Sequence, residues 1–180
     1  MLAVLMFFYF SSIRGTLIPL YRTENLTLSS VQISIIFSLS SSIVVLSMIF
    51  ISQQFEKRMR RALLLSISLL ACSVSIFSLS SAWNFNSLAL LYIPLGFSFG
   101  IFQPLPFAMI IDNSEPNNRG LTIGISRTIA DFGIILGPML AGWLLDLGQP
   151  RYTFYIVASL FGLFSYLTYR IFFKENKSSK

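Results

Sequence analysis

Six long apolar stretches dominate this chain of 180 residues and constrain its fold more than any other feature. A helix needs about 20 mostly apolar residues to cross a bilayer, and each stretch reaches that length. Strands of a membrane barrel would instead alternate polar and apolar residues, which these stretches do not do. We therefore predict an all-α integral membrane protein with six transmembrane helices. The predicted spans cover residues 2–21, 31–53, 62–83, 88–111, 121–147 and 152–173.

The composition supports the same conclusion. Apolar residues make up 54% of the chain and charged residues 11%, against about 25% charged residues in a soluble protein. The six spans use nearly the whole chain, so we predict a single six-helix transmembrane domain over residues 1–180. The only cysteine, Cys72, cannot form an intramolecular disulfide, and we interpret it as a packing residue. This composition excludes a disordered chain, a disulfide-stapled secreted domain and most soluble enzymes.

The basic residues are distributed unequally between the two ends of the spans. Residues 56–61, 112–119 and 174–180 lie on one side and hold eight Lys or Arg, whereas the loops on the other side hold two. The positive-inside rule places the more basic side, and with it both termini, in the cytoplasm of a cell that carries this protein in its plasma membrane. The net charge of +6 is thereby explained as a topology signal, and no nucleic acid partner is needed.

Two ionisable residues lie deep in the span over residues 121–147. Asp131 is about ten residues from the start of this span, or about 15 Å at 1.5 Å per residue, close to the middle of the bilayer. Arg127 lies one helical turn earlier and shares a helix face with Asp131. Two interpretations stay open: a structural ion pair that neutralises both residues, and a gate or coupling site that faces a wet cavity.

Two further charged residues need an explanation. Arg14 lies in the first span, and its side chain leans away from the nearer interface, so it has either a structural role or a role in substrate or ion binding. Asp112 ends the fourth span on the cytoplasmic side. It is either a solvated helix end or a partner for the basic loop around Arg60.

Glycine and proline gather in the fourth and fifth spans. Small residues at GxxxG spacing let helix backbones approach closely, and Gly96–Gly100, Gly120–Gly124 and Gly133–Gly137 have this spacing. In the fifth span a small and polar stripe lies opposite a large apolar face. The stripe holds Gly124, Thr128, Asp131, Ile135, Pro138 and Gly142, and the apolar face holds Ile125, Ile129, Phe132, Leu136, Leu140 and Trp143. The fourth span repeats the pattern with Pro94, Gly96, Gly100, Gln103, Pro104 and Pro106, as is typical of transporter helices that are broken beside a moving pathway.

Three segments resemble the major facilitator superfamily of secondary transporters. Residues 124–142 are similar to its glycine-proline helix motif, with Ala141 in place of a glycine. Residues 52–65 are similar to its basic loop between the second and third helices of a half, where Ser52, Glu56 and Met59 depart from the usual pattern and Arg60 and Arg61 keep it. Residues 112–120 are similar to its acidic loop before the fifth helix of a half.

The resemblance implies one six-helix half of a twelve-helix transporter that works by alternating access, and coupling to protons stays open. The C-terminal half is favoured and the N-terminal half stays open. The chain enters its first span at Met1, which favours a part of something larger. The implied partners are the lipid bilayer, a small-molecule substrate, and a second half on another chain or a second copy; neither cofactor nor metal is implied. The implied substrate or coupling residues are Arg14, Gln103, Arg127 and Asp131, the gating charge cluster is Glu56, Arg60, Arg61, Asp112 and Arg119, and the helix-packing motif is Gly124, Gly133, Gly137, Pro138 and Gly142.

Two other classes of protein compete with a transporter. A membrane scaffold or accessory subunit that retains the fold would suit the altered basic loop. A membrane enzyme is disfavoured because the loops hold no histidine, no cysteine cluster, no nucleophile motif and no paired carboxylates.

Overall fold

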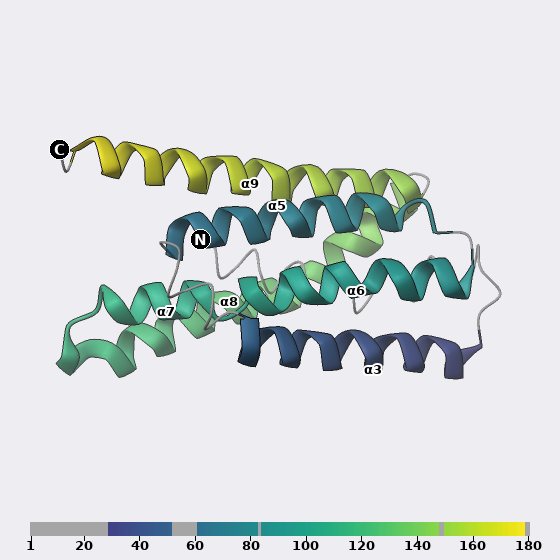
Figure 1. The fold of residues 1–180 in the computed structure, drawn as a ribbon, viewed down its shortest axis with the longest axis horizontal. Helices are drawn as coiled ribbons and strands as arrows, with labels where there is room; N and C mark the ends of the chain where they lie inside the picture. The colour runs from purple at the N-terminus through teal and green to yellow at the C-terminus, as the bar shows by residue number, and fades with distance from the viewer. Residues whose placement is uncertain (1–28, 52–60, 83, 148–149, 179–180) are drawn as a thin grey trace. The chain divides into compact units, whose positions relative to one another are not determined.

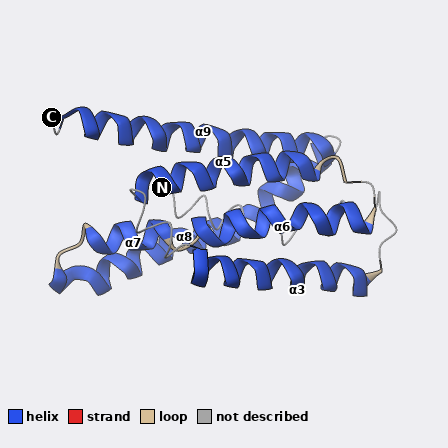
Figure 2. Cartoon of the chain, in the orientation of Figure 1, coloured by secondary structure: helices blue, strands red, loops and turns tan. Residues whose placement is uncertain are grey.

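The computed structural model describes residues 29–51, 61–82, 84–147 and 150–178. Every regular element among these residues is a helix (Figure 2). Five helical segments are long and apolar enough to cross a membrane. The prediction of an all-α membrane protein is therefore confirmed. The first predicted span, residues 2–21, lies outside the described residues, and the single six-helix domain stays a prediction.

The helices follow the predicted spans closely (Figure 1). They are α3 (Ser30–Leu46) with a π-helical turn (Ser47–Ile51), α5 (Arg61–Leu79), α6 (Phe85–Phe102), α7 (Leu105–Asp112), a 3-10 turn (Pro116–Asn118), α8 (Arg119–Leu147) and α9 (Pro150–Ser178). The start of α6 is set by a capping box. The Asn84 side-chain oxygen accepts a hydrogen bond from the Ser87 backbone amide at 2.9 Å. The Asn84 backbone amide donates to the Ser87 hydroxyl at 3.1 Å.

The predicted span over residues 88–111 is two helices, because the chain turns at Gln103 and Pro104 between α6 and α7. Proline has no amide hydrogen. Pro104 and Pro106 therefore remove the two donors that would reach the carbonyls of Gly100 and Phe102 in a continuous helix. Pro106 then lies in the first turn of α7, where its missing donor costs nothing. The predicted break in this span is confirmed and lies at Pro104.

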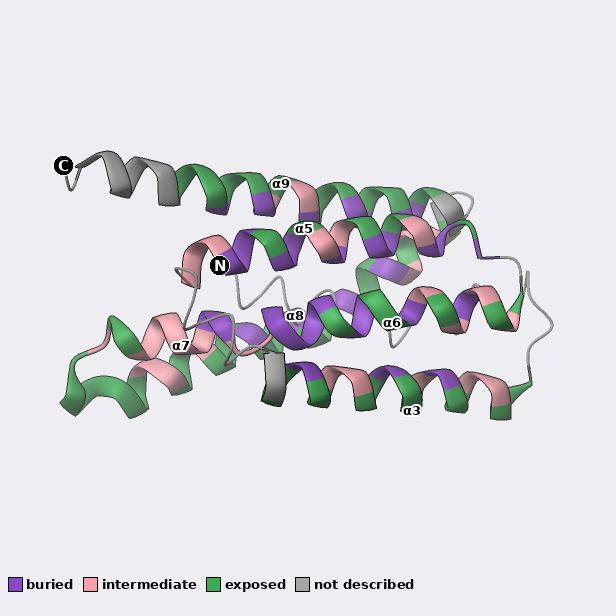
Figure 3. Ribbon diagram, in the orientation of Figure 1, coloured by how far each residue is buried: buried purple, intermediate pink, exposed green. Residues whose placement is uncertain are grey.

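The described residues form two compact units. One unit, residues 106–153, contains α7 from Pro106, α8 and the 3-10 turn between them. The other, residues 30–105 and 154–178, is named here the four-helix unit, and its helices lie side by side in the order α3, α6, α5, α9 (Figure 1). Its core lies along α5 and α6, where large side chains such as Leu65, Ile76, Tyr92 and Phe102 are buried (Figure 3). Cys72 is buried in α5 as well.

Two glycines bring α6 close to α3 within the four-helix unit. A Cβ added to Gly96 would lie 3.1 Å from the carbonyl oxygen of Ser40. A Cβ added to Gly100 would lie 2.5 Å from the carbonyl oxygen of Val44 and 2.7 Å from the Cβ of Ser47. At Gly100 only glycine leaves room for this backbone contact, and at Gly96 a side chain would be tight, so the first GxxxG pair packs two helices together as predicted.

Serines join α5 to α9 in the same unit. The Ser73 hydroxyl donates to the carbonyl oxygen of Ala158 at 2.6 Å, and the Ser165 hydroxyl donates to that of Ser66 at 2.7 Å. From one bond to the other the α5 position advances by seven residues and the α9 position falls by seven, so the two helices are antiparallel and in fixed register. Side-chain hydrogen bonds between helices hold such pairs together where the hydrophobic effect does not.

Candidate functional site

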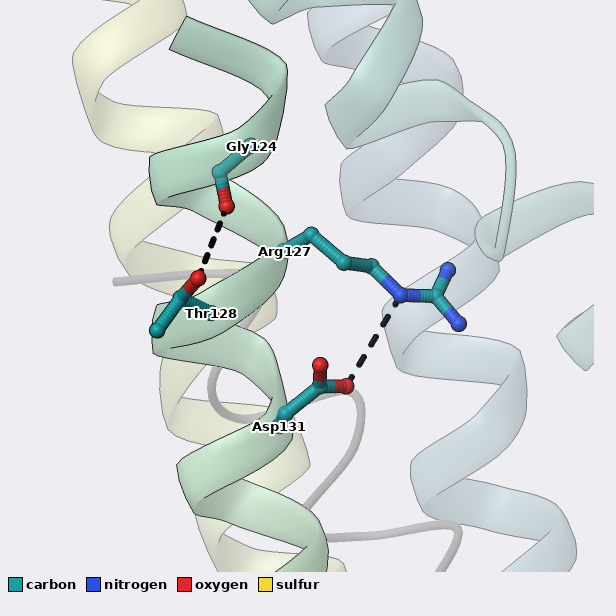
Figure 4. A network of polar contacts seen from close by, with 4 residues as sticks. All are labelled: Gly124, Arg127, Thr128 and Asp131. Carbon is teal, nitrogen blue, oxygen red and sulfur yellow. Dashed lines mark hydrogen bonds and ion pairs between the residues drawn. The ribbon is translucent and has the colours of Figure 1, made fainter. Parts of the chain in front are cut away.

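An ion pair lies at the centre of α8 (Figure 4). Asp131 is the middle residue of the membrane-length segment Pro116–Asp146. The Nε of Arg127 lies 3.7 Å from an Asp131 carboxylate oxygen, one helical turn away. This distance is that of an ion pair and is too long for a hydrogen bond. The i, i+4 spacing of a single helix is enough to bring the two charges together.

The pair is open to its surroundings. The exposed fraction of the side chain is 58% for Arg127 and 51% for Asp131. Charged side chains inside a membrane rarely face lipid and usually face water, protein or each other. A half-exposed pair at the middle of a span therefore needs a water-filled cavity or a second protein surface in front of it.

Small residues precede this pair on the helix surface, whereas the exposed Ile135 lies one turn after Asp131. Gly124 lies one turn before Thr128, and a Cβ added to Gly124 would meet no atom within 4 Å in the part of the chain that the structure describes. The Thr128 hydroxyl donates to the Gly124 carbonyl oxygen at 3.0 Å, so this hydroxyl is satisfied within its own helix (Figure 4). The predicted stripe is thus open at Gly124 and Asp131, and Arg127 lies beside it with the opposite charge.

The buried side of α8 differs from both faces that the sequence distinguished. Ala130, Gly133, Gly137 and Ala141 are buried and lie on a third side of the helix. The predicted large apolar face is exposed: the exposed fraction is 58% for both Phe132 and Trp143. Gly133 and Gly137 of the helix-packing motif therefore lie on a buried line, whereas Gly124 is exposed and Gly142 is half-buried.

The remaining predicted site residues lie in several places. Gln103 is half-buried at the turn between α6 and α7, and its backbone amide donates to the Phe99 carbonyl oxygen at 2.9 Å. Arg61 is the first residue of α5, Asp112 the last of α7 and Arg119 the first of α8. Gln103 and Arg61 belong to the four-helix unit, while Asp112 and Arg119 belong to the other unit with Arg127 and Asp131.

Part of the predicted site lies outside the described residues. This part comprises Arg14, Glu56 and Arg60. The gating charge cluster and the binding role of Arg14 therefore stay predictions. Among the residues that the structure describes, no group of three or more His, Cys, Asp or Glu side chains is arranged to hold a metal ion.

Sequence reasoning missed the serines that join α5 and α9. Ser66 and Ser73 are spaced by seven residues, which places them on one face of α5. Ser66, however, contributes only its backbone carbonyl oxygen, which any residue could supply, so this spacing does not indicate the contact. The Ser73 hydroxyl could not be singled out, because α5 also carries Ser68, Ser75 and Ser78, whose hydroxyls bond to carbonyls of α5 itself.

Known proteins resemble this chain over most of its length. The profile of the Major Facilitator Superfamily matches residues 1–180. The proton-coupled antiporter flippase LtaA of Staphylococcus epidermidis is 22% identical over 167 residues, which cover 91% of this chain and 42% of LtaA. LtaA of Staphylococcus haemolyticus is 23% identical over 148 residues, covering 81% of this chain and 37% of LtaA.

A second kind of transporter matches as well. The quinolone resistance protein NorA of Staphylococcus aureus is 27% identical over 122 residues, which cover 68% of this chain and 31% of NorA. The chain thus spans less than half the length of the curated relatives it matches. The match over the whole chain, together with five apolar helices of membrane length, identifies the protein as a multi-pass protein of the cell membrane that belongs to the major facilitator superfamily.

Proposed function

We propose that this chain forms one six-helix half, the C-terminal one, of a secondary transporter that moves a small solute by alternating access. Its two termini face the cytoplasm, and a second half on another chain or a second copy completes the pathway. The Arg127–Asp131 pair carries this proposal, because a half-exposed ion pair at the centre of a span needs a wet cavity or a partner surface. A second observation also favours the proposal: the chain matches less than half the length of its relatives, as one half of a transporter would.

Asp131 is the residue that we propose for proton coupling. Histidine is absent from the sequence. Among the described residues, Asp131 is the carboxylate at the centre of a membrane-length segment. Arg127, whose Nε lies 3.7 Å from the carboxylate, is the cation beside it. A relative that is named a proton-coupled antiporter supports this choice.

The proposal is tested with the assembled transporter in liposomes. A quinolone and a fluorescent lipid are suitable first probes, because one relative is named for quinolone resistance and another as a flippase. We expect Asp131→Asn to lower uptake driven by a pH gradient at least about tenfold, which is about 1.4 kcal/mol. Exchange of the same probe without a pH gradient should persist.

The matched control is Asp146→Asn. Asp146 is an exposed carboxylate near the C-terminal end of α8, 15 residues from Asp131. This substitution should leave pH-driven uptake near the wild-type value. Wild-type uptake by Asp131→Asn would contradict the coupling role. If an assembly with a second half moves neither protons nor probes, the non-transporting scaffold is the better function.

A further inference from the structure

An apolar groove lies between α5 and α9 of the four-helix unit. Its volume is about 280 Å³. It is lined by Leu63, Ser66, Ile67, Leu70, Gly162, Ser165, Tyr166 and Tyr169. Pockets for drug-sized ligands usually measure about 300–1,000 Å³, so this groove suits a thinner ligand such as a single hydrocarbon chain.

The groove lies at one depth in the membrane. On α5 its lining residues are 63–70, two to nine residues after the helix begins at Arg61. On α9 they are 162–169, two to nine residues before the apolar segment ends at Ile171. The antiparallel pairing puts these two ends on the same side. At 1.5 Å per residue the groove extends from about 3 to 14 Å below that surface, which is one leaflet of a ~30 Å core.

The two serine hydroxyls that line the groove are satisfied by the protein. The Ser165 hydroxyl donates to the Ser66 carbonyl oxygen at 2.7 Å, and the Ser66 hydroxyl donates to that of Leu63 at 2.8 Å. A hydrocarbon chain in the groove would therefore leave neither hydroxyl without its hydrogen bond, which is the main cost of covering polar groups.

A positive charge lies at the rim of the groove. The guanidinium of Arg170 is 5.7 Å from the ring centroid of Tyr166, which lines the groove. Arg170 is exposed and lies one residue from the end of the apolar segment. The sequence adds Lys174 and Lys177 one and nearly two helical turns further on. Basic sites between membrane helices on the cytoplasmic side attract lipid headgroups that carry negative charge.

We propose that the α5–α9 groove binds one acyl chain of an anionic phospholipid of the cytoplasmic leaflet, whose phosphate lies at Arg170. The proposal rests on the cytoplasmic orientation of the C-terminus and is independent of which solute the protein moves. Apolar lining, confinement to one leaflet and the charge at the rim match the two ends of such a lipid.

Native mass spectrometry of the purified complex tests the proposal after equilibration with equal amounts of phosphatidylglycerol and phosphatidylcholine. We expect one phosphatidylglycerol retained for each copy of this chain. Leu70→Trp should fill the groove and abolish retention of both lipids. The matched control is Val74→Trp, an exposed α5 residue one turn away that does not line the groove, and it should retain the lipid.

The headgroup is tested separately, so the proposal can be judged even if Leu70→Trp fails to fold. Arg170→Gln should lower the preference for phosphatidylglycerol about fivefold, as expected for the loss of about 1 kcal/mol of attraction, and Arg170→Lys should restore it. Equal retention by Leu70→Trp and Val74→Trp, or an unchanged preference in Arg170→Gln, would overturn the proposal. A lipid-free dimer of this chain that Leu70→Trp dissociates would also overturn it, because a second copy would then fill the groove.

Discussion

Two glycine pairs with the same spacing have opposite surroundings in this protein. Gly96 and Gly100 of α6 face the backbone of α3, and a Cβ added to Gly100 would lie 2.5 Å from a carbonyl oxygen. For Gly120 and Gly124 of α8, no atom of the described residues lies within 4 Å of an added Cβ. The GxxxG spacing therefore gives a helix a smooth face but does not determine what lies against it.

The difference separates two uses of small residues. In the α3–α6 contact Gly100 is required for packing, and the contact is already complete within this chain. Along α8 the small residues flank an exposed ion pair and are available to water or to a second protein surface. Substitutions that add one methyl group distinguish the two uses.

Unfolding can be followed by labelling of Cys72, the only thiol, which becomes accessible when α5 separates.

The largest effect is expected for Gly100→Ala. Its methyl group would collide with the backbone of Val44, which cannot move aside without shifting α3. Overpacking of this kind costs up to about 3 kcal/mol. Alanine has a better helix propensity than glycine, which offsets about 1 kcal/mol of this cost. We expect a net loss of about 2 kcal/mol in unfolding free energy, measured as faster labelling of Cys72. Wild-type labelling would show that α3 and α6 are not held this closely.

A smaller effect of opposite sign is expected for Gly124→Ala. The new methyl group meets no neighbour among the residues that the structure describes, so the substitution should stabilise the chain by about 0.4–1 kcal/mol. The same labelling assay measures this gain. Repeating it with a bound second half sharpens the comparison, because a partner packed against Gly124 would turn the gain into weaker association. A loss of stability in the chain alone would contradict the open surface.

Ser165→Ala should have a slightly smaller effect. It removes the hydrogen bond to the Ser66 carbonyl oxygen, and bonds of this kind between membrane helices contribute about 0.6 kcal/mol on average. Thermal unfolding in detergent should show a loss of this size. Ser159→Ala is the control, because Ser159 is exposed on α9 and its hydroxyl bonds only to Tyr155 of the same helix. Equal losses in the two variants would argue against a specific α5–α9 bond.

The smallest effect is expected for Gly96→Ala. The added methyl group would lie 3.1–3.3 Å from Ser40 and Ile43, so these neighbours need to give by only a few tenths of an ångström. The mild overpacking cost of about 1 kcal/mol and the gain in helix propensity should nearly cancel. Chemical denaturation that separates Gly96→Ala from Gly100→Ala by about 2 kcal/mol would support the gradient along this contact. Equal losses would contradict it.

Local features of the sequence predicted the spans and the central ion pair. Arg127 and Asp131 meet because they are four residues apart on one helix, which needs no knowledge of the rest of the fold. The position of the helix break was harder to predict, since Pro94 and Pro138 lie inside continuous helices and Pro104 does not. The difference is the second proline at position 106, because two donors are lost within one turn.

The helix pairings could not be predicted from the sequence. The serine hydroxyls of α5 and α9 bond to backbone carbonyls, and every residue has a carbonyl, so the partner leaves no mark in the sequence. The buried line through Ala130 and Gly137 was missed for a related reason. Size and polarity vary around α8, but burial depends on contacts that no single helix specifies.

The bond between Ser165 and Ser66 also sets an order of events during synthesis. The two residues are separated by 99 positions. At about 5–20 residues per second, α5 leaves the ribosome about 5–20 s before its α9 partner exists. The α3–α6 contact closes earlier, because both helices precede α9 in the chain. The α5–α9 groove therefore forms later than the α3–α6 contact, and a lipid that binds there does so after α9 has entered the bilayer.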